Sequence, residues 1–147
     1  MVDPKHSIQE VLKRDGVWIS TTAGTSMWPM LRDRRDTIIV RPIEERLRLY
    51  DVALYRRGDA YVLHRVIKAN DGGYRIMGDN CMAYEEVPES AILGRLEEFW
   101  RGERHCDPRS AAWLLYACIW HDLLPIRKGI RRIHGAAKRV AHKIGLK

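Results

Sequence analysis

The feature that most constrains the fold of this chain is a series of short segments rich in β-branched and aromatic residues. Turn-forming Gly, Asn, Asp and Pro residues separate these segments roughly every ten residues. The expected strands are residues 17–22, 37–41, 51–55, 60–69, 74–77 and 91–99. Short strands with such regular turns are typical of an antiparallel sheet that coils into a barrel. We therefore predict a mainly β protein with a coiled, barrel-like antiparallel core.

A short helix is expected before this core. Ser7 and Glu10 have the spacing of a capping box, in which the two side chains satisfy the first backbone N–H groups of a helix reciprocally. Gly16 can take the left-handed conformation that closes a helix. Residues 1–102 are therefore expected to form the core together with an N-terminal helix.

After the core, the sequence changes to helical patterns. An apolar segment at 111–124 is followed, beyond Pro125, by a second segment whose apolar residues recur at intervals of four and three. These residues are Ile126, Ile130, Ile133, Ala137, Val140 and Ile144. The pattern predicts a helical hairpin within a basic, amphipathic C-terminal appendage formed by residues 103–147.

Charge separates the two parts of the chain. The net charge of the 147 residues is +7, and residues 127–147 contain eight Lys or Arg and no Asp or Glu. The rest of the chain is close to neutral. An apolar stripe on a basic helix suits an anionic membrane surface, so we expect peripheral membrane contact through residues 111–147. Packing of the stripe on the body or on a partner is a second interpretation. Nucleic acid is the least supported partner, because no recognition motif accompanies the charges.

Several classes of protein are disfavoured by the sequence. The three cysteines are odd in number and lack Cys-x-x-Cys spacing, so we expect neither a disulfide framework nor a zinc site. The first fifteen residues are polar, and no segment approaches the ~20 apolar residues of a membrane-spanning helix. We expect a peripheral membrane or cytoplasmic protein that needs no metal or cofactor.

Four short motifs suggest chemistry. They are Ser26-Met27-Trp28-Pro29, His64-Arg65-Val66, Gly78-Asp79-Asn80 and Leu93-Gly94-Arg95. In this order they resemble the catalytic core of type I signal peptidases, and more closely the branch that uses histidine as the base. The resemblance covers residues 16–98. The N-terminal anchor that normally precedes the serine in this family is not apparent in this sequence.

The resemblance implies a serine endopeptidase that cleaves leader or signal peptides after small residues. Ser26 would be the nucleophile and His64 the general base that takes its proton. Gly24, Thr25 and Met27 would form the oxyanion and substrate site around the serine. The partner would be an extended peptide or a precursor protein.

The acid that would orient His64 is less well defined. Relatives with histidine as the base carry a pair of aspartates shortly after Gly-Asp-Asn, and here Glu85 or Glu86 lies near that place. Asp79 is the favoured orienting acid. Glu85 and Glu86 are possible acidic helpers, or residues of a solvated turn.

Two other functions fit parts of the sequence. A catalytically degenerate, peptide-binding module on the same fold is suggested by the altered segment after Asn80. A self-cleaving regulator of the repressor type is less well supported. Such proteins use lysine where this chain has His64, and they carry a DNA-binding domain before the core.

Overall fold

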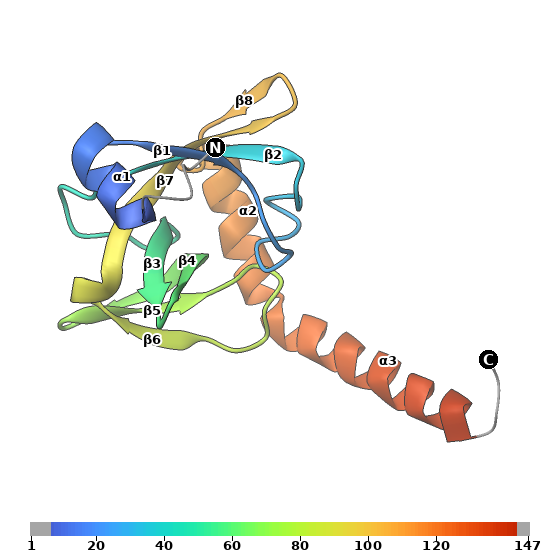
Figure 1. Cartoon of the computed structure of the whole chain (residues 1–147). Helices are drawn as coiled ribbons and strands as arrows, with labels where there is room; N and C mark the ends of the chain where they lie inside the picture. The colour runs from blue at the N-terminus through green and yellow to red at the C-terminus, as the bar shows by residue number, and fades with distance from the viewer. Residues whose placement is uncertain (1–6, 144–147) are drawn as a thin grey trace.

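The computed structural model describes residues 7–143, which form a curved sheet with a short helix on one side and two helices on the other (Figure 1). The helices are α1 (Ile8–Asp15), η1 (Glu89–Ala91, a single 3₁₀ turn), α2 (Ala111–Asp122) and α3 (Leu124–Lys143). The strands are β1 (Trp18–Thr21), β2 (Asp36–Arg41), β3 (Val52–Arg57), β4 (Ala60–Asn70), β5 (Gly73–Met77), β6 (Glu85–Pro88), β7 (Ile92–Arg101) and β8 (Arg104–Cys106).

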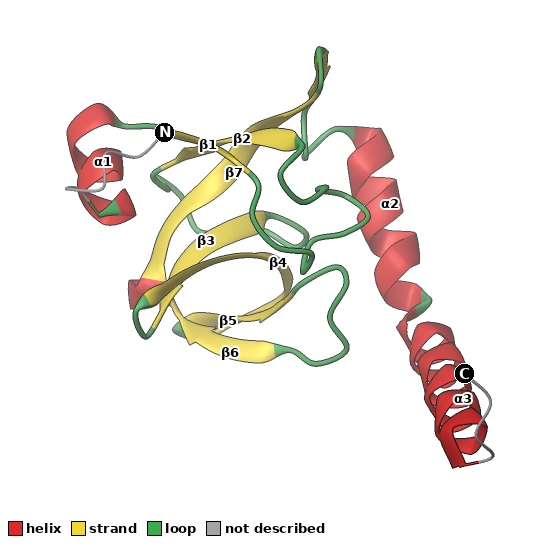
Figure 2. Cartoon of the chain, turned by 45° about the vertical axis from the view of Figure 1, so that its right-hand side comes forward, coloured by secondary structure: helices red, strands yellow, loops and turns green. Residues whose placement is uncertain are grey.

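All strand pairs in the sheet are antiparallel. The order is β1-β2-β7-β3-β4-β5-β6, and β8 forms a hairpin with β7. Shifts of register occur at Ile39/Val40, Leu54/Tyr55 and Val66/Lys68. Such bulges bend strands, and the sheet coils into a half-barrel (Figure 2). The predicted mainly β, barrel-like antiparallel fold is therefore confirmed.

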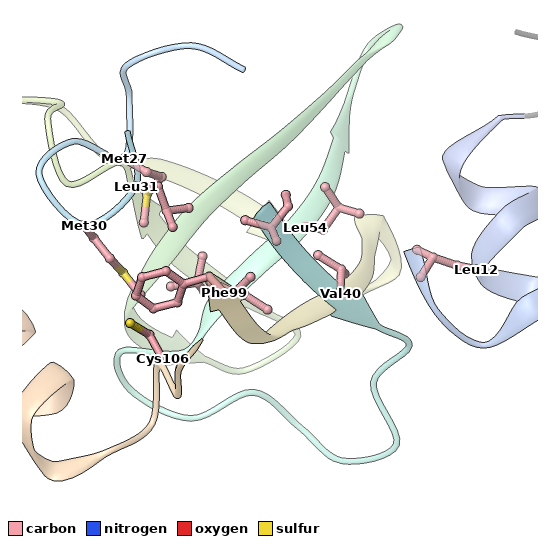
Figure 3. Packing of buried hydrophobic residues seen from close by; sticks show 11 residues of the cluster. Leu12, Met27, Met30, Leu31, Val40, Leu54, Phe99 and Cys106 are labelled. Atoms are coloured by element: carbon pink, nitrogen blue, oxygen red, sulfur yellow. The ribbon is translucent and has the colours of Figure 1, made fainter. Parts of the chain in front are cut away.

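Two apolar clusters form the core of the protein. The larger cluster joins Leu12 of α1 to residues such as Met30, Val40 and Phe99 (Figure 3). The second cluster is formed by residues of β3, β4, β5, β6 and β7, and it includes Tyr55 and Ile76. The loop between β1 and β2 takes part in the first cluster through its methionines, so it is packed as part of the core.

The N-terminal helix forms as its caps predict. The Ser7 N–H donates to Glu10 Oε2 at 2.8 Å, and the Glu10 N–H donates to Ser7 Oγ at 3.2 Å. Gly16 closes the helix with a φ of 68°. The capping box and the glycine therefore set both ends of α1.

Two strands were not expected from the sequence. Glu85–Pro88 forms the edge strand β6, although a solvated turn was one interpretation of Glu85 and Glu86. Charged residues and proline are tolerated at a sheet edge because one side of the strand faces solvent. Arg104–Cys106 forms β8, so the boundary expected at residue 102 falls inside the β7–β8 hairpin.

The expected helical hairpin is not formed. The Leu123 N–H bonds to the Ile119 carbonyl at 3.0 Å and the Arg127 N–H to the Leu123 carbonyl at 2.9 Å, so helical bonding continues across the junction. Pro125 lies in the first turn of α3, where the missing N–H needs no partner in the helix. As a result α3 continues away from the end of α2 and from the sheet (Figures 1 and 2). We call residues 111–143 the helical arm.

None of the helices between residues 7 and 143 combines the length and the apolar character that a membrane-spanning helix requires.

Candidate active site

The serine lies in the loop that links β1 to β2, residues 22–35, which we call the serine loop. At its base, Thr22 Oγ1 donates to the Arg32 carbonyl at 2.5 Å. The Arg32 guanidinium in turn donates to Asp36 Oδ1, with its closest nitrogen at 2.6 Å. Gly24 has a φ of 88°, and its N–H donates to Asp33 Oδ1 at 2.7 Å. Hydrogen bonds within the loop therefore fix the chain on both sides of Ser26.

The sheet holds the serine loop through hydrogen bonds and apolar packing. Arg101 of β7 donates to the carbonyls of Pro29 at 2.6 Å and Met30 at 2.5 Å. Met27 and Met30 are buried in the larger apolar cluster (Figure 3). Met27 therefore anchors the loop beside the half-buried Ser26.

The Gly78-Asp79-Asn80 turn holds the serine loop from the other side. The Asn80 N–H donates to the Ser26 carbonyl at 2.8 Å, and its side-chain amide donates to the Thr25 carbonyl at 3.1 Å. These bonds connect two motifs that are more than fifty residues apart in the sequence.

Gly78 is the point at which the serine and the histidine converge. A side chain on Gly78 would place its Cβ 2.6 Å from the Ser26 carbonyl oxygen and 2.9 Å from Nε2 of His64. The Sγ of Cys81 would lie 2.7 Å from the same point. Glycine is therefore required here by close packing, and Nε2 of His64 points toward the serine loop.

His64 is nearly buried, with 5% of its surface exposed, and its other ring nitrogen is held by a tyrosine. Tyr55 Oη lies 3.2 Å from Nδ1 of His64 and donates its proton to Glu85 Oε1 at 3.0 Å. Because the single phenolic proton goes to the carboxylate, the Tyr55 oxygen accepts from Nδ1–H. Nε2 then carries the lone pair, as a general base requires.

The protonation states of this group follow from burial and charge. Burial raises the pKa of Tyr55, and the neighbouring Glu85 carboxylate raises it further, so the phenol keeps its proton. Burial lowers the pKa of His64 below 6.5, partly opposed by Glu85. Arg57 donates to Glu85 at 2.8 Å and also lowers the His64 pKa. The imidazole is therefore neutral at pH 7.

Asp79, the favoured orienting acid, is held elsewhere. Its carboxylate receives two bonds of 2.8 Å from the buried Arg65 and one of 3.0 Å from Tyr116 Oη. Burial by itself would raise the pKa of Asp79, but the Arg65 bonds outweigh it and the pKa lies below its ordinary value. Asp79 therefore fixes the turn beside the site, and Glu85 holds the position, through Tyr55, that was expected of Asp79.

Glu86 has no place in this group. Its exposed side chain accepts from Arg75 at 2.7 Å and from Asn70 at 3.0 Å, on the outer side of β6. Strand alternation explains the difference, since neighbouring residues of β6 point to opposite faces. Of the two glutamates, only Glu85 faces His64.

A cleft of about 590 Å³ contains the serine and the histidine. It is lined by β1 and the residues that follow it, Ser20 to Gly24, by Ser26, by Tyr61 to His64 of β4, and by Cys81 and Glu85 among others. Within residues 7–143, nothing accepts a hydrogen bond from the Ser26 N–H, and no hydrogen bond joins Ser26 Oγ to His64. The amide is thus available to a ligand, and the serine hydroxyl is not yet engaged with the base.

The helical arm contacts the outer side of the Gly78-Asp79-Asn80 turn. The indole N–H of Trp120 donates to the Asp79 carbonyl at 2.7 Å, and Arg127 donates to the same oxygen at 2.5 Å. Arg131 donates to the Asn80 side-chain oxygen at 2.7 Å. The arm therefore supports the turn that holds the serine loop.

Tyr55 and the residues of the arm were missed from the sequence. The strands expected at 51–55 and 60–69 would have placed Tyr55 opposite residue 60, whereas the actual two-residue turn pairs Arg57 with Ala60. In the actual register Ala53 lies opposite His64, and Tyr55 becomes its diagonal neighbour on the same face. The sequence signal that could have identified Tyr55 is a hydroxyl-bearing residue inside an otherwise apolar strand.

Among residues 7–143, no group of three or more His, Cys, Asp or Glu side chains could hold a metal ion. Comparison with models of known protein families finds no match for the chain, and comparison with curated proteins finds none either.

Proposed function

We propose that this chain is a serine endopeptidase of the signal-peptidase type, with Ser26 as nucleophile and His64 as general base. The observation that carries the proposal is the convergence of His64 Nε2 and the Ser26 backbone beside Gly78, in one cleft. A serine hydroxyl needs an adjacent base, and a neutral imidazole with its lone pair on this side can act as one. Small movements of the serine side chain complete such contacts when substrate binds.

The chemical steps follow from this arrangement. Nε2 of His64 takes the Oγ proton as Ser26 attacks the scissile carbonyl, and the Ser26 amide donates to the resulting oxyanion. His64 then returns the proton to the leaving amine. Water, deprotonated by the same nitrogen, hydrolyses the acyl-enzyme. Glu85 favours the imidazolium through Tyr55 during both proton transfers.

The substrate is an extended peptide. β1 lies at one edge of the sheet, opposite the edge formed by β6, and the residues from Ser20 to Gly24 line the cleft. A peptide can add to such an edge with main-chain hydrogen bonds. The apolar residues Met27, Leu31 and Leu54 also line the cleft and would accept a small apolar side chain before the scissile bond. Leader peptides of membrane-bound or cytosolic precursors fit this description.

The test is cleavage of a model leader peptide that carries an Ala-x-Ala site. Wild type is compared with Ser26→Ala and His64→Ala, and with Ser110→Ala as a matched serine control outside the site. Loss of cleavage in the first two variants alone would support the peptidase. Labelling by a serine-reactive fluorophosphonate should follow the same pattern.

A peptide-binding module without catalysis is the second candidate, and the absence of a Ser26–His64 hydrogen bond within residues 7–143 favours it. It would be indicated by wild type that binds the peptide, leaves it intact and does not react with the fluorophosphonate. Titration of a fluorescent leader peptide measures binding independently of turnover. The two functions therefore give opposite results with the same peptide.

A further inference from the structure

A row of exposed aliphatic side chains runs along both helices of the arm. The row consists of Leu115, Ile119, Leu123, Ile126, Ile130, Ile133 and Val140, which are between 40% and 69% exposed. Their intervals of three, four or seven residues place them along one side of the helical arm. We call them the aliphatic stripe; Ile144, the last residue of the expected pattern, lies outside the described residues.

The stripe lies on the side of the arm that faces away from the sheet. The opposite side of α2 carries Trp113, which packs against Phe99 with ring centroids 5.1 Å apart, and the fully buried Ala117. Figure 1 shows α2 beside the sheet and α3 extending beyond it. The interpretation that the stripe packs on the body is therefore wrong for the described residues.

Basic residues flank the stripe. From Leu124 to Lys143 the sequence contains seven Lys or Arg and no Asp or Glu. Helical spacing puts Arg132 on one flank of the stripe and Lys138 on the other. Long basic side chains on such flanks can extend their charged ends toward an anionic surface while their methylene groups cover apolar area.

We propose that the helical arm docks on the surface of a bilayer that contains anionic phospholipids. The aliphatic stripe enters the boundary between headgroups and acyl chains, and the flanking cations lie among the phosphates. This inference depends on the arm alone and does not require that Ser26 be catalytic.

A second copy of the chain fits the stripe less well. Two such helices packed along their stripes would bring cations together with no carboxylate from α3 to pair them. The stripe also contains only Leu, Ile and Val, whereas the centres of protein interfaces are enriched in aromatic residues and methionine. The aromatic side chains Trp113, Tyr116 and Trp120 are used on the opposite side, against the body.

The test is sedimentation of the full chain with vesicles of phosphatidylcholine alone or mixed with phosphatidylglycerol. Binding is expected only with phosphatidylglycerol, and it should weaken as salt is raised. The variant Ile126→Gln/Ile130→Gln/Ile133→Gln keeps helix propensity and removes apolar area. We expect it to bind at least about a hundredfold more weakly. Ile19→Gln, which changes an equally exposed aliphatic residue on β1, outside the helical arm, should bind as wild type does.

Three results would overturn the proposal. One is no binding to either vesicle, and another is equal binding to both. The third is a wild-type dimer in solution that the triple variant abolishes while vesicle binding is absent, which would assign the stripe to a second copy. Circular dichroism of the triple variant keeps the test interpretable, and Arg132→Gln/Lys138→Gln checks the charges without changing the stripe. Since peptide cleavage is not measured, failure here leaves the proposed peptidase untouched.

Discussion

The phenolic oxygen of Tyr55 lies 3.2 Å from Nδ1 of His64 and joins the imidazole to a carboxylate beyond normal hydrogen-bond reach. That carboxylate belongs to Glu85, whose nearest oxygen is 3.6 Å from the same nitrogen. The carboxylate, the phenol and the imidazole thus form a hydrogen-bonded series in which each proton has one acceptor. This series fixes the tautomer of the histidine, which is the property that a base needs before substrate arrives.

Tyr55→Phe should reduce kcat by about tenfold to a hundredfold with little change in KM, because Nδ1 loses its acceptor while the ring still fills its place. Peptide cleavage under steady-state conditions measures both constants. Tyr84→Phe, at an exposed tyrosine, is the matched control. A variant with wild-type kcat would show that Tyr55 does not orient the base.

The pH profile of cleavage should reflect the lowered pKa of His64. Cleavage requires the neutral imidazole, so kcat/KM should fall only as pH drops through a value below 6.5. The Glu85 charge raises this pKa and the Arg57 charge lowers it. Glu85→Gln should therefore move the midpoint to lower pH, and Arg57→Gln should move it to higher pH. Midpoints that shift in the same direction would contradict this electrostatic account.

Much of the fold could be predicted because its strands have local signals. β-branched residues and turn residues located six strands, and the capping box located α1. These local signals fail where contacts between distant segments determine the secondary structure. Glu85–Pro88 becomes a strand because β5 offers a partner edge, and the helical arm stays extended because helical hydrogen bonding continues across the junction of α2 and α3.

The sequence motifs were enough to predict which serine and histidine belong to the candidate site. Ser26 and His64 are marked by their neighbours, and the structure brings both into one cleft. The acid was not predictable, because two acidic segments lie close in sequence and only the register of β3, β4 and β6 decides between them. That register assigns Asp79 to Arg65 and turns Glu85 toward His64.

Asp79→Asn should destabilise the fold by about 3–5 kcal/mol, because the buried Arg65 guanidinium would lose its charged partner. Urea unfolding measures the change, with Asp59→Asn as a fully exposed control. The pKa of Asp79 is lowered on folding. Its contribution is thus complete above its ordinary value of 3.8 and is lost as pH falls through the folded pKa. Equal stability of Asp79→Asn and wild type at pH 7 would exclude this structural role.

The variant Trp120→Phe tests whether the helical arm contributes to catalysis. It removes the N–H bond to the Asp79 carbonyl but keeps an aromatic ring, at a cost of about 1 kcal/mol in stability. Asn80 follows Asp79 in the chain and its N–H holds the Ser26 carbonyl. We therefore expect kcat to fall by about tenfold. Trp100→Phe, on β7, is the control for loss of an indole. A change in stability without a change in kcat would mean that the arm supports the fold and not the serine loop.

Gly78→Ala offers the sharpest test of the convergence of serine and histidine. The added methyl group would lie within 3 Å of the Ser26 carbonyl and His64 Nε2, so one or both must move apart. The carbonyl belongs to the backbone and is held by Asn80, so His64 is the group more easily displaced. A shift of about 1 Å at a reacting group costs roughly a hundredfold in rate. We expect such a loss in kcat from a chain that still folds, as judged by circular dichroism.

The matched control is Gly129→Ala in α3, where the new methyl group would meet no described atom within 4 Å apart from its chain neighbours and the backbone of its own helix. Alanine is favoured over glycine in a helix, so this variant should gain up to about 1 kcal/mol in stability and keep full activity. Full activity in both variants would show that the cleft tolerates a side chain between Ser26 and His64. In that case the two residues would not act on one substrate atom. Activity lost in Gly78→Ala alone would instead locate the chemistry at the point where the two motifs meet.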